Sequence, residues 1–259
     1  MHLGLQGKVA VVTAGGSGIG LAVAQAFAAE GATVVVGDLD TTAVSSTAGI
    51  VAHRLDLLET DAPRLLIEQA LAETGRVDIL VNAMGGPTHR GEGFLAIDDD
   101  AWRRSLDLNL LTLIRTCRAA IPHMVRGGGG SIVHLASDAA RQPDPIFVDY
   151  CVAKAALLSL SKALSIEFAS RGIRSNCVSP GPTNTPGFMN FFTAHVAPQW
   201  GVTAVEAVDR FVHEIRKIPA GKLGEPTDVA RVVVFLASDA AKHVTGSDYR
   251  VDGGVVISP

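Results

Sequence analysis

The chain has few of the features that mark a protein bound to nucleic acid or to a membrane. Its formal net charge is −4, no segment is rich in Lys or Arg, and aromatic residues make up 5% of it. A basic footprint and a base-stacking surface are therefore both missing, and we expect no nucleic-acid partner. Apolar runs stay below the roughly 18 residues that a membrane-spanning helix needs, so we also expect no membrane partner.

Cysteine is scarce as well. The three cysteines, Cys117, Cys151 and Cys177, are odd in number and widely spaced, which fits neither a disulfide framework nor a zinc site. The N-terminus has no charged-then-apolar signal segment, so we expect a cytoplasmic protein. Metal-ligand spacing is also missing among the histidines, and we expect no metal site at His89, His123, His134, His195 or His213.

What the chain does have is a repeating pattern of strands and helices. Its 259 residues, 47% of them hydrophobic, suit one domain with a large core. Short β-branched runs predict strands at Val9–Thr13, Thr33–Asp38, Val51–Asp56, Asp78–Asn82, Ser131–Leu135 and Arg174–Ser179. Helical patterns lie at Gly18–Glu30, Ala62–Thr74, Asp98–Val125 and Asp149–Ser170. Together they predict an α/β fold of the Rossmann type, a doubly wound parallel sheet of about seven strands with helices on both faces, in a single domain over residues 1–259.

Two of these helices are apolar on more than one side. Asp98–Val125 and Asp149–Ser170 carry apolar residues beyond the stripe that would face the sheet. A partner subunit covering the second side would make the protein a homotetramer or a homodimer. A broad core stripe within one chain explains the pattern equally well.

A segment over residues 183–222 differs from the rest and is called the flap segment below. It combines several prolines with Phe188, Phe192 and Trp200, and it has a helical pattern near Val205–Arg216. Exposed apolar residues in a connecting segment suit a substrate-binding flap. An ordinary small subdomain or an oligomer contact is the alternative.

A glycine-rich turn follows the first strand and opens into a helix. Its sequence over 13–20 is Thr-Ala-Gly-Gly-Ser-Gly-Ile-Gly, and glycines there let a backbone approach a pyrophosphate at a helix N-terminus. Asp38 ends the second strand, where a carboxylate can accept hydrogen bonds from an adenosine ribose and repel a 2′-phosphate. No Lys or Arg lies between Thr13 and Gly37 or directly after Asp38. The pattern therefore predicts NAD(H) as cofactor over NADP(H).

A candidate acid/base site lies between residues 137 and 154. Ser137 follows an apolar strand, and Tyr150 and Lys154 stand four residues apart at the start of a helix, on one face. At a separation of about 4 Å and an effective dielectric of about 20, the Lys154 ammonium favours the Tyr150 phenolate by roughly 4 kcal/mol, on the order of three pKa units. Such a tyrosine could give and take back a proton near neutral pH. The alternative is that this Tyr–Lys spacing arose by chance on a partly exposed helix and has no catalytic role.

Together these residues resemble the short-chain dehydrogenase/reductase family along essentially the whole chain. The family's glycine motif is similar to 13–20, its Asn-Asn-Ala-Gly motif to 82–85, and its Pro-Gly motif to 180–181. The resemblance implies a catalytic set of Asn109, Ser137, Tyr150 and Lys154. It implies cofactor contacts at Gly15, Ser17, Gly18, Ile19, Gly20, Asp38, Leu39, Asp56, Leu57, Asn82, Ala83, Met84, Tyr150, Lys154, Pro180, Gly181 and Thr183.

Residue roles follow from this resemblance and from the chemistry of carbonyl reduction. Tyr150 would donate the proton, and Ser137 would hydrogen-bond the same oxygen. Lys154 would lower the pKa of Tyr150 and bind the nicotinamide ribose, and Asn109 would hold a water that relays protons. Substrate contacts are expected at Ser137, Tyr150, Phe188 and Phe192.

Two positions depart from the family pattern. Ala14 replaces the first glycine of the turn, and we expect Gly15 to supply the conformational freedom instead. Met84 replaces the usual alanine. The stretch 39–50 is short, so the helix expected there is stunted.

Three functions are weighed. The leading one is an NAD-dependent dehydrogenase or reductase of a fairly apolar secondary alcohol or ketone. The second is a 3-oxoacyl thioester reductase, for which Arg126 and Arg171 could bind a carrier protein while Asp38 argues against NADPH. The third is a dinucleotide-binding regulatory protein without turnover, which would be expected to have lost Tyr150 or Lys154.

Overall fold

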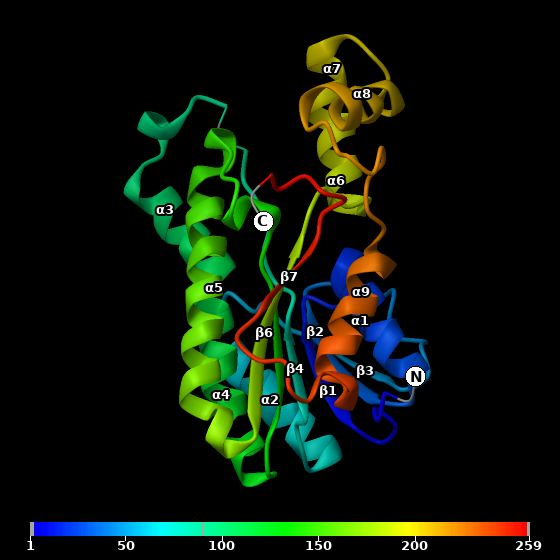
Figure 1. Ribbon diagram of the computed structural model, residues 1–259, viewed down its shortest axis with the longest axis vertical. Coiled ribbons are helices and arrows are strands. Elements are labelled where there is room, and N and C mark those ends of the chain that lie inside the picture. Colours follow the sequence, from blue (N-terminus) through cyan, green and yellow to red (C-terminus); the bar gives the residue numbers. More distant parts are fainter. Residues whose placement is uncertain (1–2, 90, 258–259) are drawn as a thin grey trace.

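One parallel sheet forms the centre of the computed structural model, which describes residues 3–89 and 91–257 (Figure 1). Within these residues the sheet has seven strands in the order β3-β2-β1-β4-β5-β6-β7. The first two residues of the N-terminal segment lie outside the description. The strands are β1 (Val9–Thr13), β2 (Thr33–Asp38), β3 (Ile50–Arg54), β4 (Ile79–Asn82), β5 (Gly130–Leu135), β6 (Ile173–Pro180) and β7 (Asp248–Val251).

The predicted parallel sheet is confirmed, with differences at its edges. All six predicted strands are present, and β3 ends at Arg54 where the sequence predicted Asp56. Residues 39–49 form turns and contain no helix, as the short connection indicated. β7 was not predicted, because this edge strand is only half-buried and its residues Asp-Tyr-Arg-Val lack a β-branched run.

Helices cover both faces of the sheet. On one face lie α1 (Gly18–Ala29) and α9 (Pro226–Ala237), and on the other lie α2 (Ala62–Thr74), α4 (Thr112–Arg126) and α5 (Val148–Phe168) (Figure 1). Side chains of a strand alternate between faces, so Val12 and Val34 pack with α1 and α9 while Val11 and Val35 pack with α2 and α4. Apolar residues are thus needed on both faces of the central strands.

The predicted helix Asp98–Val125 is interrupted. It divides into α3 (Asp99–Leu106), the π-helical turn η2 (Asp107–Leu111) and α4. The hydroxyl of Thr112 donates to the carbonyl of Asp107 at 2.8 Å, inside the widened turn. π-Helical turns occur often at functional sites, and this one contains Asn109.

The flap segment is helical and stands at the upper end of the molecule (Figure 1). Its elements are α6 (Pro186–Phe191), η6 (Phe192–Val196), α7 (Ala197–Trp200), α8 (Ala204–Arg210) and η7 (Phe211–Ile215). An aromatic cluster with Phe192 at its centre packs them into a small core of their own. None of the described helices combines the length and apolarity needed to cross a membrane.

Candidate active site

The strand order reverses between β1 and β4, and this is where the site is built. In doubly wound sheets, ligands bind beyond the carboxyl ends of the strands at such a reversal. The hydroxyl oxygen of Thr13, at the end of β1, accepts the N–H groups of Ala83 at 3.0 Å and Met84 at 3.2 Å. The loop after β4 is thereby held against the end of β1.

The glycine-rich turn fits a pyrophosphate. A Cβ at Gly16 would lie 1.9 Å from the carbonyl oxygen of Asp40, and one at Gly20 would lie 2.0 Å from that of Ala14. Ser17 begins α1 without a side-chain cap, which leaves the first N–H groups of the helix available to an anion. Neighbouring Gly18 has a left-handed φ of +53°. The residues present therefore fit the diphosphate of a dinucleotide.

The expectation for Gly15 is wrong, because Ala14 itself takes the left-handed conformation, with φ of +52°. This costs an L residue about 1–2 kcal/mol. Gly15 is required for space instead, since a Cβ there would lie 2.8 Å from Val36 Cγ1.

Asp38 lies where the sequence predicted, against the glycine-rich turn. Its Oδ2 accepts the N–H of Gly16 at 2.8 Å and its Oδ1 that of Asp40 at 3.1 Å. Although the sequence around Asp38 has no basic residue, the fold brings one close to it. Arg54 pairs in register with Asp38 across β2 and β3, and its Nε donates to the carbonyl of Leu39 at 3.1 Å.

Two of the expected cofactor contacts, Asp56 and Leu57, lie just beyond the neighbouring strand β3. Asp56 follows β3, and its carboxylate accepts the N–H of Leu58 at 3.0 Å. Leu57 is buried, whereas Leu39 is largely exposed.

Tyr150 and Lys154 project from the first turns of α5 toward the end of β5. The Nζ of Lys154 lies 5.6 Å from the centre of the Tyr150 ring and donates to the carbonyl of Leu135 at 2.7 Å. Ser137 follows β5; its hydroxyl donates to Asp138 Oδ1 at 2.9 Å and accepts the N–H of Ala139 at 3.1 Å. Ser137, Tyr150 and Lys154 therefore converge at one strand end.

Burial dominates the acid/base properties of this group. It raises the pKa of Tyr150 to about 12, and a hydrogen bond with Ser137 acts in the opposite direction. It lowers the pKa of Lys154 to about 8. The pKa of Tyr150 thus lies above its ordinary value because of burial, and the lowering expected from Lys154 stays a prediction. A buried ammonium with a pKa near 8 can itself exchange protons close to neutral pH.

Asn109 reaches the same place from the π-helical turn η2. Its Oδ1 accepts the N–H of Gly86 at 2.9 Å, and its Nδ2 donates to the carbonyls of Ser105 at 3.0 Å and Gly86 at 3.2 Å. A Cβ at Gly85 would lie 2.6 Å from Asn109 Oδ1 and 2.8 Å from Lys154 Nζ. The two side chains thus flank Gly85, and only glycine fits between them.

The Pro-Gly turn after β6 borders the site from the other side. The N–H of Gly181 donates to the carbonyl of Val251 at 3.0 Å, and a Cβ at Gly181 would lie 2.7 Å from Asp252 Cα. Thr183 is buried, and its hydroxyl donates to the carbonyl of Gly181 at 2.9 Å. Pro180 ends β6 at this turn.

The predicted substrate residues divide. Phe192 is 3% exposed and stacks on Phe188 with ring centres 4.5 Å apart, so we assign it to the core of the flap segment and not to a direct substrate contact. Phe188 is half-buried beside it. Phe191 instead reaches outward: its ring lies 5.6 Å from that of His89, which lies 6.1 Å from that of Phe147.

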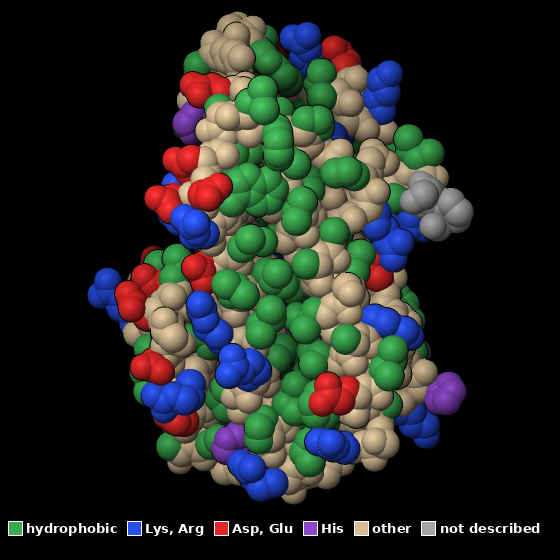
Figure 2. Space-filling view, turned by 90° about the vertical axis from the view of Figure 1, so that its left-hand side faces the viewer, with side chains coloured by type: hydrophobic (Ala, Val, Ile, Leu, Met, Phe, Trp, Pro, Cys, Tyr) green, Lys and Arg blue, Asp and Glu red, His purple; other side chains and the backbone are tan. Residues whose placement is uncertain are grey.

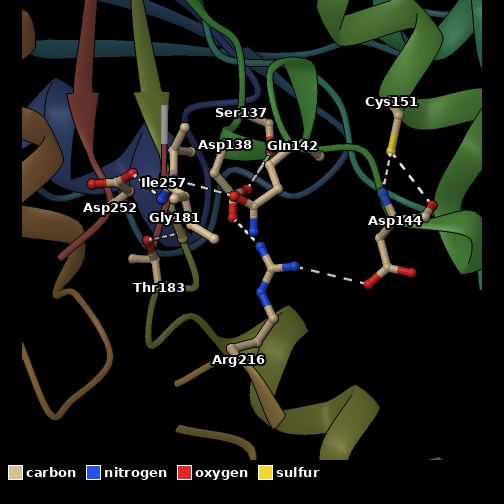
Figure 3. Close-up of polar contacts among 12 residues, drawn as sticks. Ser137, Asp138, Gln142, Asp144, Cys151, Gly181, Thr183, Arg216, Asp252 and Ile257 are labelled. Atoms are coloured by element: carbon tan, nitrogen blue, oxygen red, sulfur yellow. Dashed lines mark hydrogen bonds and ion pairs between the residues drawn. The ribbon is translucent and has the colours of Figure 1, made fainter. Parts of the chain in front are cut away.

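Sequence reasoning missed two features of this region. One is the group of neighbouring rings formed by Phe191, His89 and Phe147. The other is Arg216, which forms an ion pair with Asp138 from the end of the flap segment (Figure 3). Nothing in the helical pattern around Arg216 indicated its partner.

Known proteins are similar to this chain over nearly its full length. A family model described as enoyl-(acyl carrier protein) reductase matches residues 13–256. The 2,5-dichloro-2,5-cyclohexadiene-1,4-diol dehydrogenase of Sphingobium indicum is 37% identical over 96% of this chain and 96% of its own. The 3-oxoacyl-[acyl-carrier-protein] reductase of Thermotoga maritima is 31% identical over 98% and 99%. L-Sorbose reductase of Gluconobacter frateurii, solved with NADPH and L-sorbose, superposes with a TM-score of 0.93 at 31% identity over 100% of both chains.

Proposed function

The chain belongs to the short-chain dehydrogenase/reductase family, and we propose that it transfers a hydride between NAD(H) and a secondary alcohol or ketone. The observation that carries this proposal is the convergence of Ser137, Tyr150, Lys154 and Asn109 beside a turn that fits a dinucleotide. The relatives named above include a diol dehydrogenase and a sugar reductase, which supports a secondary alcohol or ketone as the reacting group.

The proton chemistry is assigned to this chain's own side chains. In ketone reduction Tyr150 gives its phenolic proton to the substrate oxygen, and Ser137 hydrogen-bonds that oxygen. Lys154 steadies the resulting phenolate by its positive charge and then returns a proton to it, and Asn109 holds a water that reprotonates Lys154. In alcohol oxidation each proton moves the other way.

The cofactor site is formed by the turn at 15–20, the strand end at Asp38 and the loop at 82–84. When bound, the nicotinamide dinucleotide supplies or accepts the hydride. Lys154 also binds its ribose in this proposal, and Pro180, Gly181 and Thr183 border its nicotinamide end. The flap segment lies over the substrate and selects it.

Asp38 supports NAD(H) over NADP(H). Its carboxylate is held against the glycine-rich turn, where it would accept ribose hydroxyls and repel a 2′-phosphate. Arg54 is the opposing influence, since a guanidinium binds phosphate well.

Replacing Asp38 by Ala should narrow the cofactor preference. We expect the wild type to favour NAD⁺ over NADP⁺, and the variant to lose about 10- to 100-fold of that ratio because a charge-assisted ribose hydrogen bond and the repulsion of phosphate both disappear. The ratio of kcat/KM for the two cofactors measures this. Asp40→Ala, two residues further on, is the matched control and should keep the wild-type ratio. A wild type that already prefers NADPH would contradict the assignment.

A second candidate reaction is reduction of a 3-oxoacyl thioester. The description of the family model and the similar reductase of Thermotoga maritima favour it. A panel of secondary alcohols, ketones and one 3-oxoacyl thioester, followed by NADH absorbance, separates the two reactions. Turnover confined to the thioester would replace the first proposal. No turnover by any member would leave the regulatory alternative.

We also propose that the subunits associate through α4 and α5 as a homotetramer or a homodimer. A groove of about 620 Å³ runs between these helices, lined by apolar residues that include Ile121 and Leu164. Figure 2 shows hydrophobic side chains down the middle of the face that lies on the left of Figure 1. Ile166 of α5 is 71% exposed. The cytoplasmic location stays a prediction.

Replacing Ile166 by Glu should reduce the size of the assembly. A charge in a desolvated interface is costly, so light scattering at micromolar concentration should show a multimer for the wild type and smaller species for the variant. Val205→Glu changes a similarly exposed residue of the flap segment and should leave the mass unchanged. A monomeric wild type would contradict this association.

A further inference from the structure

One side chain links the end of the flap segment to the loop that follows Ser137. Arg216 follows η7, and its Nη2 pairs with Asp138 Oδ2 while its Nη1 lies 3.9 Å from Asp144 Oδ2 (Figure 3). Both partners of the first pair are mostly buried, with side-chain exposures of 16% and 9%. An ion pair this well shielded from water has a fixed geometry, in contrast to the exposed pairs elsewhere on the surface.

Asp138 also accepts a hydrogen bond from the hydroxyl of Ser137. The hydroxyl of Ser137 donates to Asp138 Oδ1, while the other carboxylate oxygen binds Arg216. A serine hydroxyl has a single proton, so a proton held by Asp138 is not available to a substrate oxygen. The negative charge of Asp138 therefore sets how strongly the Ser137 hydroxyl is held away from the substrate oxygen.

The same carboxylate acts on Tyr150, because the negative charge of Asp138 is among the influences that raise the pKa of Tyr150. The charged and titratable groups around Asp138 are Tyr150 and Cys151 of α5, Asp144 of the loop before it, and Arg216 of the flap segment. Of these, Arg216 is the one cation among the described residues that pairs with Asp138. Without it, an uncompensated buried carboxylate would stand beside the acid/base group.

We propose that Arg216 is a positioning residue that couples closure of the flap segment to the acid/base group. Its ion pair with Asp138 holds the flap segment over the loop that follows Ser137. The positive charge of Arg216 also offsets the negative charge of Asp138, which would otherwise hold the Ser137 hydroxyl in a hydrogen bond and oppose ionisation of Tyr150. Removal of the flap segment from this position exposes Asp138 and weakens the acid/base group at the same time. The role rests on the proposed oxidoreductase function and adds to it.

The first test is a double-mutant cycle of Arg216→Gln and Asp138→Asn. Arg216→Gln alone should lower kcat about 3- to 30-fold and move the pH profile of alcohol oxidation upward by at least about 0.5 pH unit. In the Asp138→Asn background, Arg216→Gln should change kcat by less than about 2-fold and the pH profile by less than about 0.2 pH unit, because the negative charge that Arg216 offsets is gone. Lys222→Gln removes an exposed cation from the same segment and should leave both unchanged. Equal effects of Arg216→Gln in both backgrounds would overturn the proposal.

The second test needs no turnover. Chymotrypsin should cleave the flap segment of Arg216→Gln at least about fivefold faster than that of the wild type or of Lys222→Gln, because cleavage follows the population of the open form. Circular dichroism and NADH binding establish that each variant is folded. Cleavage at the wild-type rate would overturn the coupling. A wild type that turns over nothing would contradict the proposed function instead, and the cleavage rates would then decide alone whether Arg216 holds the flap segment.

Discussion

Tyr150→Phe is expected to lose turnover while it still binds NADH. The replacement removes one oxygen, the proton donor of the mechanism, and keeps the half-buried ring beside Lys154. General acid catalysis contributes about 10²- to 10⁴-fold, so we expect kcat to fall by at least the lower figure. Turnover is measured by NADH absorbance, and binding by the fluorescence of the bound nucleotide.

The chain offers a matched control, since its second tyrosine is Tyr249 on β7. Tyr249→Phe removes the same atom away from Ser137 and Lys154, and its kcat should stay within a factor of about two. Unchanged turnover in Tyr150→Phe would remove Tyr150 from the catalytic role. Loss of NADH binding together with turnover would point to a structural role.

Lys154→Met is expected to show the second large loss. At the 5.6 Å that separates the Lys154 nitrogen from the Tyr150 ring centre, an ammonium favours a phenolate by about 3 kcal/mol at an effective dielectric of about 20. This corresponds to about a hundredfold in the rate of a step that forms the phenolate. The expected result is a fall of kcat by about that factor, together with weaker NADH binding.

The pH dependence of the wild type gives an independent check on Lys154. Burial lowers the pKa of Lys154 to about 8, so the ammonium is charged below this pH and neutral above it. Ketone reduction should therefore fall as pH rises through about 8, and Lys154→Met should lack this step. Lys162→Met, on the exposed side of the same helix, should keep it. A step that persists in Lys154→Met would assign the titration to another group.

Much of the fold could be predicted because its signals are local. The buried strands β1 and β2 consist mainly of the β-branched residues Val and Thr, and their predicted bounds agree with the structure. The π-helical turn at Asn109 could not be predicted, since its apolar spacing continues that of the flanking helices. β7 also escaped prediction because partial exposure at the edge of the sheet relaxes the demand for apolar residues.

The site divides in the same way. Tyr150 and Lys154 are one helical turn apart, so their sequence spacing carried the prediction. Arg216 and Asp138 are 78 positions apart, and Arg54 reaches Asp38 only through the pairing of β2 with β3. Contacts of this kind arise from tertiary packing. They bring Arg54 close to Asp38 in the cofactor site and hold the end of the flap segment against Asp138.

The most direct test of hydride transfer uses a secondary alcohol that carries deuterium on its carbinol carbon. With whichever alcohol of the panel turns over, the account predicts deuterium in the NADH formed by the wild type, and a rate of label transfer at least about a hundredfold lower in Tyr150→Phe. Reduced cofactor without deuterium, or label transfer at the same rate in Tyr150→Phe, would contradict it.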